Sequence, residues 1–298
     1  MPDSYVGTYA SFLRGFLAPA RPLKVVFDFS NGPTALIVPQ VVQSEKSITS
    51  FYIDRTLSGN FPGHGPNPLA SGATIHLQQE VLAHHADLGV IFDADGDRAF
   101  FIDHRGRSIP AFVIAALLAR NEKGPYVFDT RTLLPLEKVG LDTTKGATLS
   151  PVGSFFIRAA MRRIGAGFGA EYSGHYYFKD FFSADSGILA AIKVMNAITR
   201  LPYPLADFYD LLPKHIAVDE VNVRSEMPTR TIARLTAHFR PHAKRAKKFD
   251  GITLDFGDWF LNARPSNTEP LVRIFAGSPN ALLLRSKIKE CERVALEH

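Results

Sequence analysis

The sequence is nearly free of cysteine. Its 298 residues include one, Cys291, so an internal disulfide cannot form and a zinc site built from several cysteines is excluded. The N-terminal stretch carries Asp3 and Arg14 and lacks the apolar segment of a signal peptide. We therefore expect a protein of the reducing cytoplasm.

Long hydrophobic runs are missing as well. The longest apolar stretch, residues 109–119, has 11 residues, whereas a membrane-spanning helix needs about 20, so no membrane partner is expected. Charge is nearly balanced, because 34 Lys and Arg against 29 Asp and Glu give +5. With 46% hydrophobic residues, the composition excludes a disordered chain and predicts a globular protein of about two or three domains.

Positive charge is concentrated in one place, between residues 240 and 248. No aromatic side chains interleave with these charges, as they would in a stretch that binds nucleic acid. We interpret the run as a solvated helix face or loop and expect no nucleic-acid partner. Its members are Arg240, His242, Lys244, Arg245, Lys247 and Lys248.

Strand and helix patterns alternate through the first two thirds of the chain. The strings VVFD at 25–28 and YVFD at 126–129 indicate two similar units of about 100 residues. The predicted strands are 24–29, 50–53, 88–92, 99–103, 126–129 and 166–171. The predicted helices are 4–18, 34–42 (broken at Pro39), 76–86, 109–120, 133–139, 154–163 and 186–200.

The texture changes after residue 213, where strand patterns dominate and two helices follow. The predicted strands are 218–223, 252–256, 259–262 and 271–276, with helices at 230–239 and 280–296. The fold class is therefore α/β, with two tandem related α/β sandwich domains followed by a small α+β C-terminal domain. We place the domains at 1–105, 106–214 and 215–298, with the linker near 212–217.

The most informative segment is IFDADGDR at residues 91–98. Asp93, Asp95 and Asp97 alternate at the C-terminal end of a predicted strand, the edge at which open α/β sheets bind ligands. Three carboxylates in one turn repel one another unless a cation lies among them, and oxygen ligands favour magnesium or calcium. An EF-hand is excluded because Arg98 and His104 occupy the positions of its glycine and glutamate. The alternative is a polar turn with capping aspartates.

A second segment, GAEYSGH at residues 169–175, brings together a carboxylate, a hydroxyl and an imidazole. In an extended segment the side chains of Glu171 and Ser173 point the same way and can hold two neighbouring sugar hydroxyls. His175 is a candidate general acid or base near neutral pH. A histidine with a purely structural role is the open alternative.

The third segment is RPSNTEP at residues 264–270, followed by Arg273. Arginine offers a bidentate fork to phosphate, and hydroxyl, amide and backbone N–H groups supply further donors. An ordinary turn flanked by prolines is the alternative. The candidate phosphate-binding residues are Arg264, Ser266, Asn267, Thr268 and Arg273.

Together, the three loops resemble those of the α-D-phosphohexomutases, the family that includes phosphomannomutase and phosphoglucomutase. The family's metal loop, D-x-D-x-D-R, is matched at residues 93–98. Its sugar loop, G-E-x-S-G-H, is matched at 171–175, and its phosphate loop, R-x-S-N/G-T-E-P, at 264–270. Order and spacing agree, and the resemblance covers residues 20–298.

The resemblance implies an isomerase with four domains around one cleft. A phosphoserine of domain 1 donates phosphate to a hexose phosphate, with Mg²⁺ as cofactor and a hexose 1,6-bisphosphate as intermediate and activator. On this chain it implies Mg²⁺ binding by Asp93, Asp95 and Asp97, with Arg98 beside the transferring phosphoryl group. It also implies catalysis by His175 and binding of substrate by Arg131, Glu171, Ser173, His175, Arg264, Ser266, Asn267, Thr268 and Arg273.

The family's serine loop, T-A-S-H-N-P, does not occur in this sequence, since the similar string PNP at 66–68 lacks the serine. The chain thus resembles domains 2 to 4. We expect it to be inactive alone or to need domain 1 in trans from a separate chain; a homodimer through the exposed face is the other option. Ser154 stands where many members have histidine, and Gly96 replaces a more frequent alanine, which we expect to be harmless.

Two other functions stay open. The chain can be a non-catalytic module that binds hexose phosphates without turnover. Residues 92–96 also resemble the D-x-D-G start of haloacid dehalogenase-like phosphatases, with Asp93 as nucleophile and Asp95 as general acid. In that class threonine follows the glycine, whereas this chain has Asp97.

Overall fold

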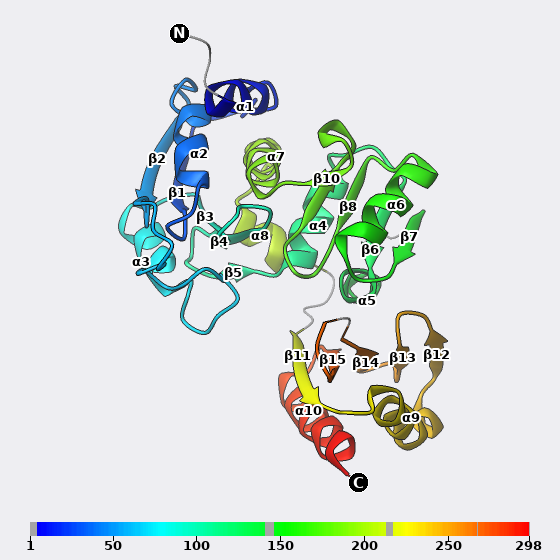
Figure 1. Ribbon diagram of the computed structural model, residues 1–298. Helices are drawn as coiled ribbons and strands as arrows, with labels where there is room; N and C mark the ends of the chain where they lie inside the picture. Colours follow the sequence, from blue (N-terminus) through cyan, green and yellow to red (C-terminus); the bar gives the residue numbers. More distant parts are fainter. Residues whose placement is uncertain (1–4, 141–145, 213–216, 267, 298) are drawn as a thin grey trace.

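Three five-stranded sheets organise the chain (Figure 1). The computed structural model describes residues 5–140, 146–212, 217–266 and 268–297. In this described part, no helix has the length and apolar character that a membrane crossing requires. The fold class predicted from the sequence is confirmed, because two related mixed sheets precede an antiparallel sheet that two helices cover.

The first sheet has the strand order β2-β1-β3-β4-β5. β1 is parallel to β2 and β3, and β3, β4 and β5 form an antiparallel meander. Its strands are β1 (Leu23–Asp28), β2 (Ile48–Ile53), β3 (Leu88–Phe92), β4 (Ala99–Asp103) and β5 (Ser108–Ile109), and its helices are α1 (Tyr5–Arg14), α2 (Thr34–Val42) and α3 (Ile75–Ala83).

The second sheet repeats this topology, with the order β7-β6-β8-β9-β10. β6 is parallel to β7 and β8, and β8, β9 and β10 are antiparallel. Its strands are β6 (Tyr126–Asp129), β7 (Ala147–Ser150), β8 (Phe168–Ala170), β9 (Tyr176–Phe178) and β10 (Ala184–Asp185). The helices of this part are α4 (Ala111–Ala119), α5 (Thr130–Val139), α6 (Ser154–Ile164), α7 (Gly187–Arg200) and α8 (Leu205–Asp210), with a short 3₁₀ turn, η2 (Lys179–Phe181).

Helices α4 and α7 join the first two sheets into one hydrophobic core. All residues of α4 are buried, as expected for a helix that is apolar all round. α7 packs against α4 and against β3 and β4 of the first sheet, and Figure 1 shows it between the two sheets. This shared core therefore fixes the positions of the two sheets, and of the loops at their edges, relative to each other.

The third sheet is antiparallel throughout, in the order β11-β15-β14-β13-β12. Helices α9 and α10 cover one face and form a separate core with it. The strands are β11 (Ala217–Arg224), β12 (Arg245–Lys248), β13 (Ile252–Asp255), β14 (Phe260–Pro265) and β15 (Leu271–Ser278). The helices are α9 (Pro228–Phe239), η3 (Arg240–His242) and α10 (Ala281–Leu296).

Several sequence predictions need correction. Pro39 lies within α2 and does not break it, because the helix runs on to Val42. The basic run is a helix or loop only in part: Arg240–His242 form η3, but the last residues form β12, whose exposed side chains line the sheet edge. Charged side chains on an edge strand oppose pairing with another chain. β7, β9, β10 and α8 were not predicted, and most of the expected linker, 213–216, lies outside the described residues.

Candidate functional site

The loop after β3 carries the three predicted aspartates. Asp93 is fully buried, and its Oδ1 accepts hydrogen bonds from the backbone N–H groups of Gly96 and Arg98, both at 3.1 Å. Nε of Arg98 donates to Oδ2 of Asp93 at 2.5 Å. Burial raises the pKa of Asp93 to about 6, although Arg98 opposes the shift. Asp93 is therefore held in place by the loop itself.

One oxygen from each of Asp93, Asp95 and Asp97 lies within 4.8 Å of the others. Asp95 is exposed and Asp97 is half-buried. Three carboxylates that converge in this way fit a hard divalent cation, which takes oxygen ligands. The structure thus brings the predicted aspartates together in one acidic cluster.

A second cluster lies behind this loop, at the ends of β1 and β2. Nε2 of His64 is 3.1 Å from Oδ1 of Asp28 and 3.8 Å from Oδ2 of Asp54. Ser30, beside it, donates from Oγ to the carbonyl of Phe92 at 2.5 Å. The hydrogen bond to Asp28 raises the pKa of His64. We assign this cluster to the support of the β3 loop.

Residues 171–175 form a turn, so the predicted extended segment is wrong. The N–H of Glu171 donates to the carbonyl of His175 at 3.0 Å, and Gly174, with φ 88°, donates to the carbonyl of Glu171 at 3.1 Å. Glycine adopts this left-handed conformation without steric cost. Oγ of Ser173 lies 2.9 Å from Nδ1 of His175. The turn therefore directs the hydroxyl toward the imidazole.

Glu171 faces inward from this turn and is 2% exposed. Its Oε1 accepts from the N–H of Gly153 at 2.7 Å, just before α6, and its Oε2 accepts from the hydroxyl of Tyr177 at 2.6 Å. Burial, followed by the charge of Asp129, raises the pKa of Glu171. These contacts tie the turn to the second sheet.

The β3 loop and the 171–175 turn meet directly. Arg98 and His175 form an isolated antiparallel β-bridge, and the N–H of Ala99 donates to the carbonyl of Gly174 at 3.2 Å. Oδ2 of Asp97 lies 3.4 Å from Nε2 of His175. Burial alone would lower the pKa of His175, but Asp97 and Glu171 raise it overall. Loops from two different sheets therefore form one polar surface.

Arg131 lies at the start of α5 and is almost fully buried. Its Nε donates to Oδ2 of Asp129 at 3.0 Å, and one terminal nitrogen donates to Oε2 of Glu220, on β11, at 3.0 Å. The guanidinium lies 5.5 Å from the centre of the Tyr172 ring. Although burial opposes it, Asp129 and Glu220 raise the pKa of Arg131. Arg131 thus links the second sheet to the third.

The third predicted loop follows β14. Arg264 pairs in register with Arg273 of β15, so both side chains lie on one face of the sheet. Arg264 is 5% exposed, and its Nε has no hydrogen-bond partner among the described residues. Arg273 lies 3.7 Å from Glu220 and 3.4 Å from Glu269. Burial, then the charge of Arg131, lowers the pKa of Arg264.

Among the described residues of this loop, Pro265, Thr268, Glu269 and Pro270 are exposed and Ser266 is half-buried. The N–H of Thr268 donates to Oγ of Ser266 at 3.4 Å. Asn267 lies outside the described residues. Sequence reasoning missed Asp129, Tyr172 and Glu220 as members of the site. Asp129 is the last residue of a buried strand, and Asp93 directly follows one. This shared position could have identified Asp129 from the sequence, whereas Glu220 has no such feature.

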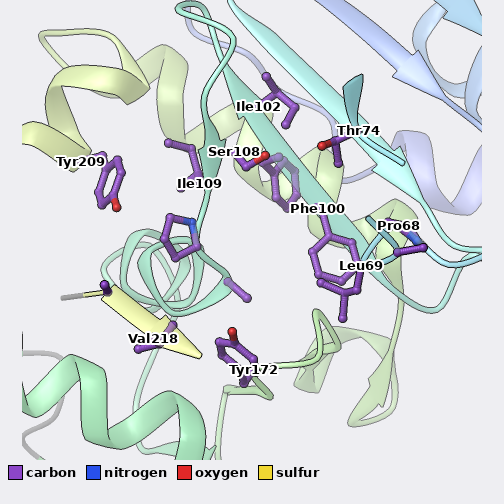
Figure 2. Close-up of a pocket in the computed structure, with 15 residues that line it drawn as sticks. Pro68, Leu69, Thr74, Phe100, Ile102, Ser108, Ile109, Tyr172, Tyr209 and Val218 are labelled. Atoms are coloured by element: carbon purple, nitrogen blue, oxygen red, sulfur yellow. The ribbon is translucent and has the colours of Figure 1, made fainter. Parts of the chain in front are cut away.

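An apolar cavity of about 470 Å³ adjoins the site at Tyr172 (Figure 2). Phe100, Ile109, Tyr209 and Val218 line it, from the first sheet, α8 and β11. Apart from Tyr172, the candidate residues are not among its lining. The cavity is therefore a neighbour of the polar site and not the place where its charged groups converge.

Comparison with known families identifies two consecutive matches. Residues 3–106 match the description "Phosphoglucomutase/phosphomannomutase, alpha/beta/alpha domain II". Residues 106–215 match domain III of the same family. Together these matches span both of the mixed sheets.

Curated relatives extend over nearly the whole chain. Phosphomannomutase of Escherichia coli is 34% identical over 284 residues, which are 91% of this chain and 61% of that protein. Phosphomannomutase of Salmonella typhimurium is 33% identical over 278 residues, 89% of this chain and 61% of that protein. The chain thus spans about three fifths of the length of these relatives.

Solved structures show the same fold. A phosphoglucomutase/phosphomannomutase family protein from Burkholderia thailandensis superimposes with a TM-score of 0.82 at 25% identity, covering 98% of this chain and 64% of that one. An Aspergillus fumigatus N-acetylphosphoglucosamine mutase, solved with GlcNAc-6P and magnesium, gives a TM-score of 0.65 at 15% identity, covering 98% and 64%. The second similarity concerns the fold alone.

Proposed function

The chain belongs to the phosphoglucomutase/phosphomannomutase family, and from that premise we propose that it forms the metal- and substrate-binding part of a phosphohexomutase. It binds hexose 1-phosphates and 6-phosphates for intramolecular phosphoryl transfer. We propose that the three sheets correspond to domains 2, 3 and 4, bounded near residues 105 and 214.

The observation that carries the proposal is a continuous series of polar contacts across all three sheets. Asp97 contacts His175, and Glu171 of the same turn lies beside Asp129, whose Oδ1 accepts from the N–H of Tyr172 at 3.3 Å. Asp129 pairs with Arg131, and Glu220 joins Arg131 to Arg273. These contacts thus connect the proposed metal loop to the proposed phosphate loop.

We assign metal binding to Asp93, Asp95 and Asp97, whose oxygens converge. Mg²⁺ bound there would neutralise charge on the transferring phosphoryl group. Arg98, fixed by Asp93, places a second positive charge beside that group, where charge develops during transfer. The crystal structure of the A. fumigatus mutase with magnesium supports this choice of cation.

For the sugar, Ser173 and His175 offer polar groups at the meeting point of two sheets. His175, next to Asp97, can accept a proton when it is neutral and donate one when it is protonated. Glu171 has both oxygens engaged by Gly153 and Tyr177, so we assign it to positioning the turn. Its contact with a sugar hydroxyl stays a prediction from the sequence. Arg131, Arg264, Ser266, Asn267, Thr268 and Arg273 hold the phosphate that does not react.

The proposed reaction needs a phosphoryl donor. The family's serine loop is not among these 298 residues, so we propose that these residues turn substrate over only together with a serine-bearing domain 1 and by themselves bind it without turnover. A hexose 1,6-bisphosphate would serve as activator. The non-catalytic binding module is the second candidate, because the same polar contacts would bind a hexose phosphate without turnover, whereas the family assignment leaves the phosphatase interpretation unsupported.

A mutase assay tests the proposal. The purified chain is given mannose 1-phosphate or glucose 1-phosphate, Mg²⁺ and the matching 1,6-bisphosphate, with and without the isolated domain 1 of a relative. We expect 6-phosphate to form only with domain 1, and Asp93→Ala to abolish it. Turnover by the chain alone would contradict the role given to the serine.

Binding separates the two candidates. Calorimetry should detect mannose 6-phosphate binding to the chain alone at millimolar concentrations. If the sugar phosphate binds and domain 1 never restores turnover, the binding module is the better description. If no hexose phosphate binds to the folded chain, both candidates fail.

A further inference from the structure

Glu220 forms ion pairs with Arg131 of α5 and Arg273 of the third sheet. It lies on β11 with its side chain 16% exposed. Its Oε2 accepts from Arg131 of α5 at 3.0 Å, and its Oε1 lies 3.7 Å from Arg273 of β15. Its charge also acts on Arg264. No sequence motif marks this residue.

The register of the third sheet explains why these groups converge. Glu220 pairs with Phe275, and Arg264 pairs with Arg273, two residues before Phe275 on the same strand. Alternate residues of a strand share a face, so all four side chains lie on one face. Phe275 contacts Tyr172 of the second sheet, with ring centres 4.9 Å apart. That face is therefore the one turned toward the 171–175 turn.

The arginines on this face are not all neutralised. Arg131 has a second carboxylate, Asp129, and Arg273 has the exposed Glu269. Arg264, which is buried, has no ion pair among the described residues, and its Nε is unpartnered. Glu220 consequently supplies the buried negative charge that a phosphate group would supply when it binds.

We propose that Glu220 is an internal anion that holds Arg131 and Arg273 until a phosphate group binds, and so lowers the affinity of the site for phosphate. The inference rests on the proposed function, because it takes Arg264 and Arg273 to bind the substrate phosphate. Phosphate and carboxylate compete for the same guanidinium donors. Since Arg131 begins helix α5 and Glu220 lies on β11, the exchange also loosens a contact between the second α/β unit and the third sheet.

The test compares Glu220→Gln with wild type by calorimetry, using mannose 6-phosphate and inorganic phosphate as probes. Glutamine keeps the shape and removes the charge. We expect both probes to bind about fivefold more tightly to the variant, the size expected for one ion pair near the surface. Mannose without phosphate should show no change.

Two variants serve as controls. Asp219→Asn makes the same charge change at the neighbouring, exposed residue of β11, on the other face, and should leave affinity unchanged. Glu220→Asp keeps the charge and should stay near wild type. A merely structural role would instead alter thermal unfolding without tightening phosphate binding.

The outcomes are distinct. If mannose 6-phosphate binds wild type and Glu220→Gln binds it equally or more weakly, the inference is wrong and the proposed function stands. If neither protein binds either probe, the phosphate site itself is wrong, and the proposed function fails together with the inference. Equal tightening by Asp219→Asn would show a general charge effect and would also overturn the role of Glu220.

Discussion

The carboxylate of Asp97 lies 3.4 Å from Nε2 of His175, although the two residues follow strands of different sheets. Asp97 is a candidate metal ligand, and His175 is the candidate acid or base. The hydrogen bond from His175 lowers the pKa of Asp97. Metal binding and proton transfer in the proposed reaction are therefore expected to depend on each other.

Asp95, the exposed residue of the proposed metal loop, offers the cleanest test of cation binding. Asp95→Asn should weaken binding of Mn²⁺, used as a paramagnetic substitute for Mg²⁺, by at least about tenfold. Because Asp95 is exposed, folding should not change. Asp180→Asn, at an exposed carboxylate that pairs with Lys193, is the matched control. Equal Mn²⁺ affinity in the Asp95 variant would remove Asp95 from the site.

Gly96 is expected to resist substitution, contrary to the sequence-based expectation that alanine is harmless there. Its φ is 79°, and a Cβ would lie 2.3 Å from Cγ2 of Thr34. Gly96→Ala should lower the free energy of unfolding by about 1–2 kcal/mol, because L-residues disfavour this conformation. Circular dichroism during urea unfolding measures it.

Thr34→Ser removes the clashing methyl group and keeps the hydroxyl. The double variant Thr34→Ser/Gly96→Ala should therefore recover part of the lost stability, whereas Thr34→Ser alone serves as the reference. Strictly additive effects of the two changes would show that the methyl contact does not matter, and only the backbone conformation would then remain as the cause.

Substitutions of Glu171 and Ser173 should affect stability and substrate binding differently. Glu171→Ala leaves the N–H of Gly153 and the hydroxyl of Tyr177 without their acceptor, so we expect a loss of about 2–3 kcal/mol. Ser173→Ala should change stability by less than about 0.5 kcal/mol and still weaken mannose 6-phosphate binding. Urea unfolding and calorimetry on both variants provide the comparison. Unchanged stability of Glu171→Ala would argue against its positioning role.

Asp255 should make the stability of the third sheet depend on pH. Burial alone would raise its pKa, but hydrogen bonds from Lys138 of α5, at 2.5 Å, and from Arg245 lower it below the usual 3.8. Because the pKa of Asp255 is lower in the folded protein, its contribution to stability is fully present above pH 3.8. That contribution is lost as the pH falls through the folded-state pKa. Asp255→Asn should thus cost about 1 kcal/mol at pH 6 and less at pH 3.

Trp259 reports this change, since it is the single tryptophan and is buried in the core of the third sheet. Its fluorescence during urea unfolding follows that sheet. Asp258→Asn, at the exposed neighbour of Trp259, is the control and should show no pH-dependent difference. A cost of Asp255→Asn that stays the same at pH 3 would contradict the ion-pair explanation.

The local pattern predicted the elements that are apolar along their own length. β3 and β4 have the expected bounds because apolar residues stop at Asp93 and at Asp103. α5 begins earlier than expected, at Thr130, because the Asp129 side chain accepts from the N–H of Thr132 and caps the helix. β12 has no strand pattern and exists because β13 offers it an edge.

The candidate site shows the same division. The aspartates, the Glu-Tyr-Ser-Gly-His turn and the arginine loop stand out in the sequence because unusual polar groups gather within a few residues. The predicted extended conformation of residues 171–175 is wrong, because the chain turns at Gly174. Glu220 could not be found, because an alternating polar residue on a strand is ordinary until its partners are known.

The sequence by itself determined the order of the longer helices and strands, the repeat of two α/β units and the polar groups of each loop, because these depend on neighbours along the chain. Only the tertiary structure decided that Asp97 meets His175 and that Arg131 meets Glu220. Those meetings depend on α4 and α7 packing in a core shared by two sheets, and on the third sheet turning its arginine-bearing face to the second. No local periodicity encodes such contacts, because they arise from surfaces that fit one another after the elements have formed.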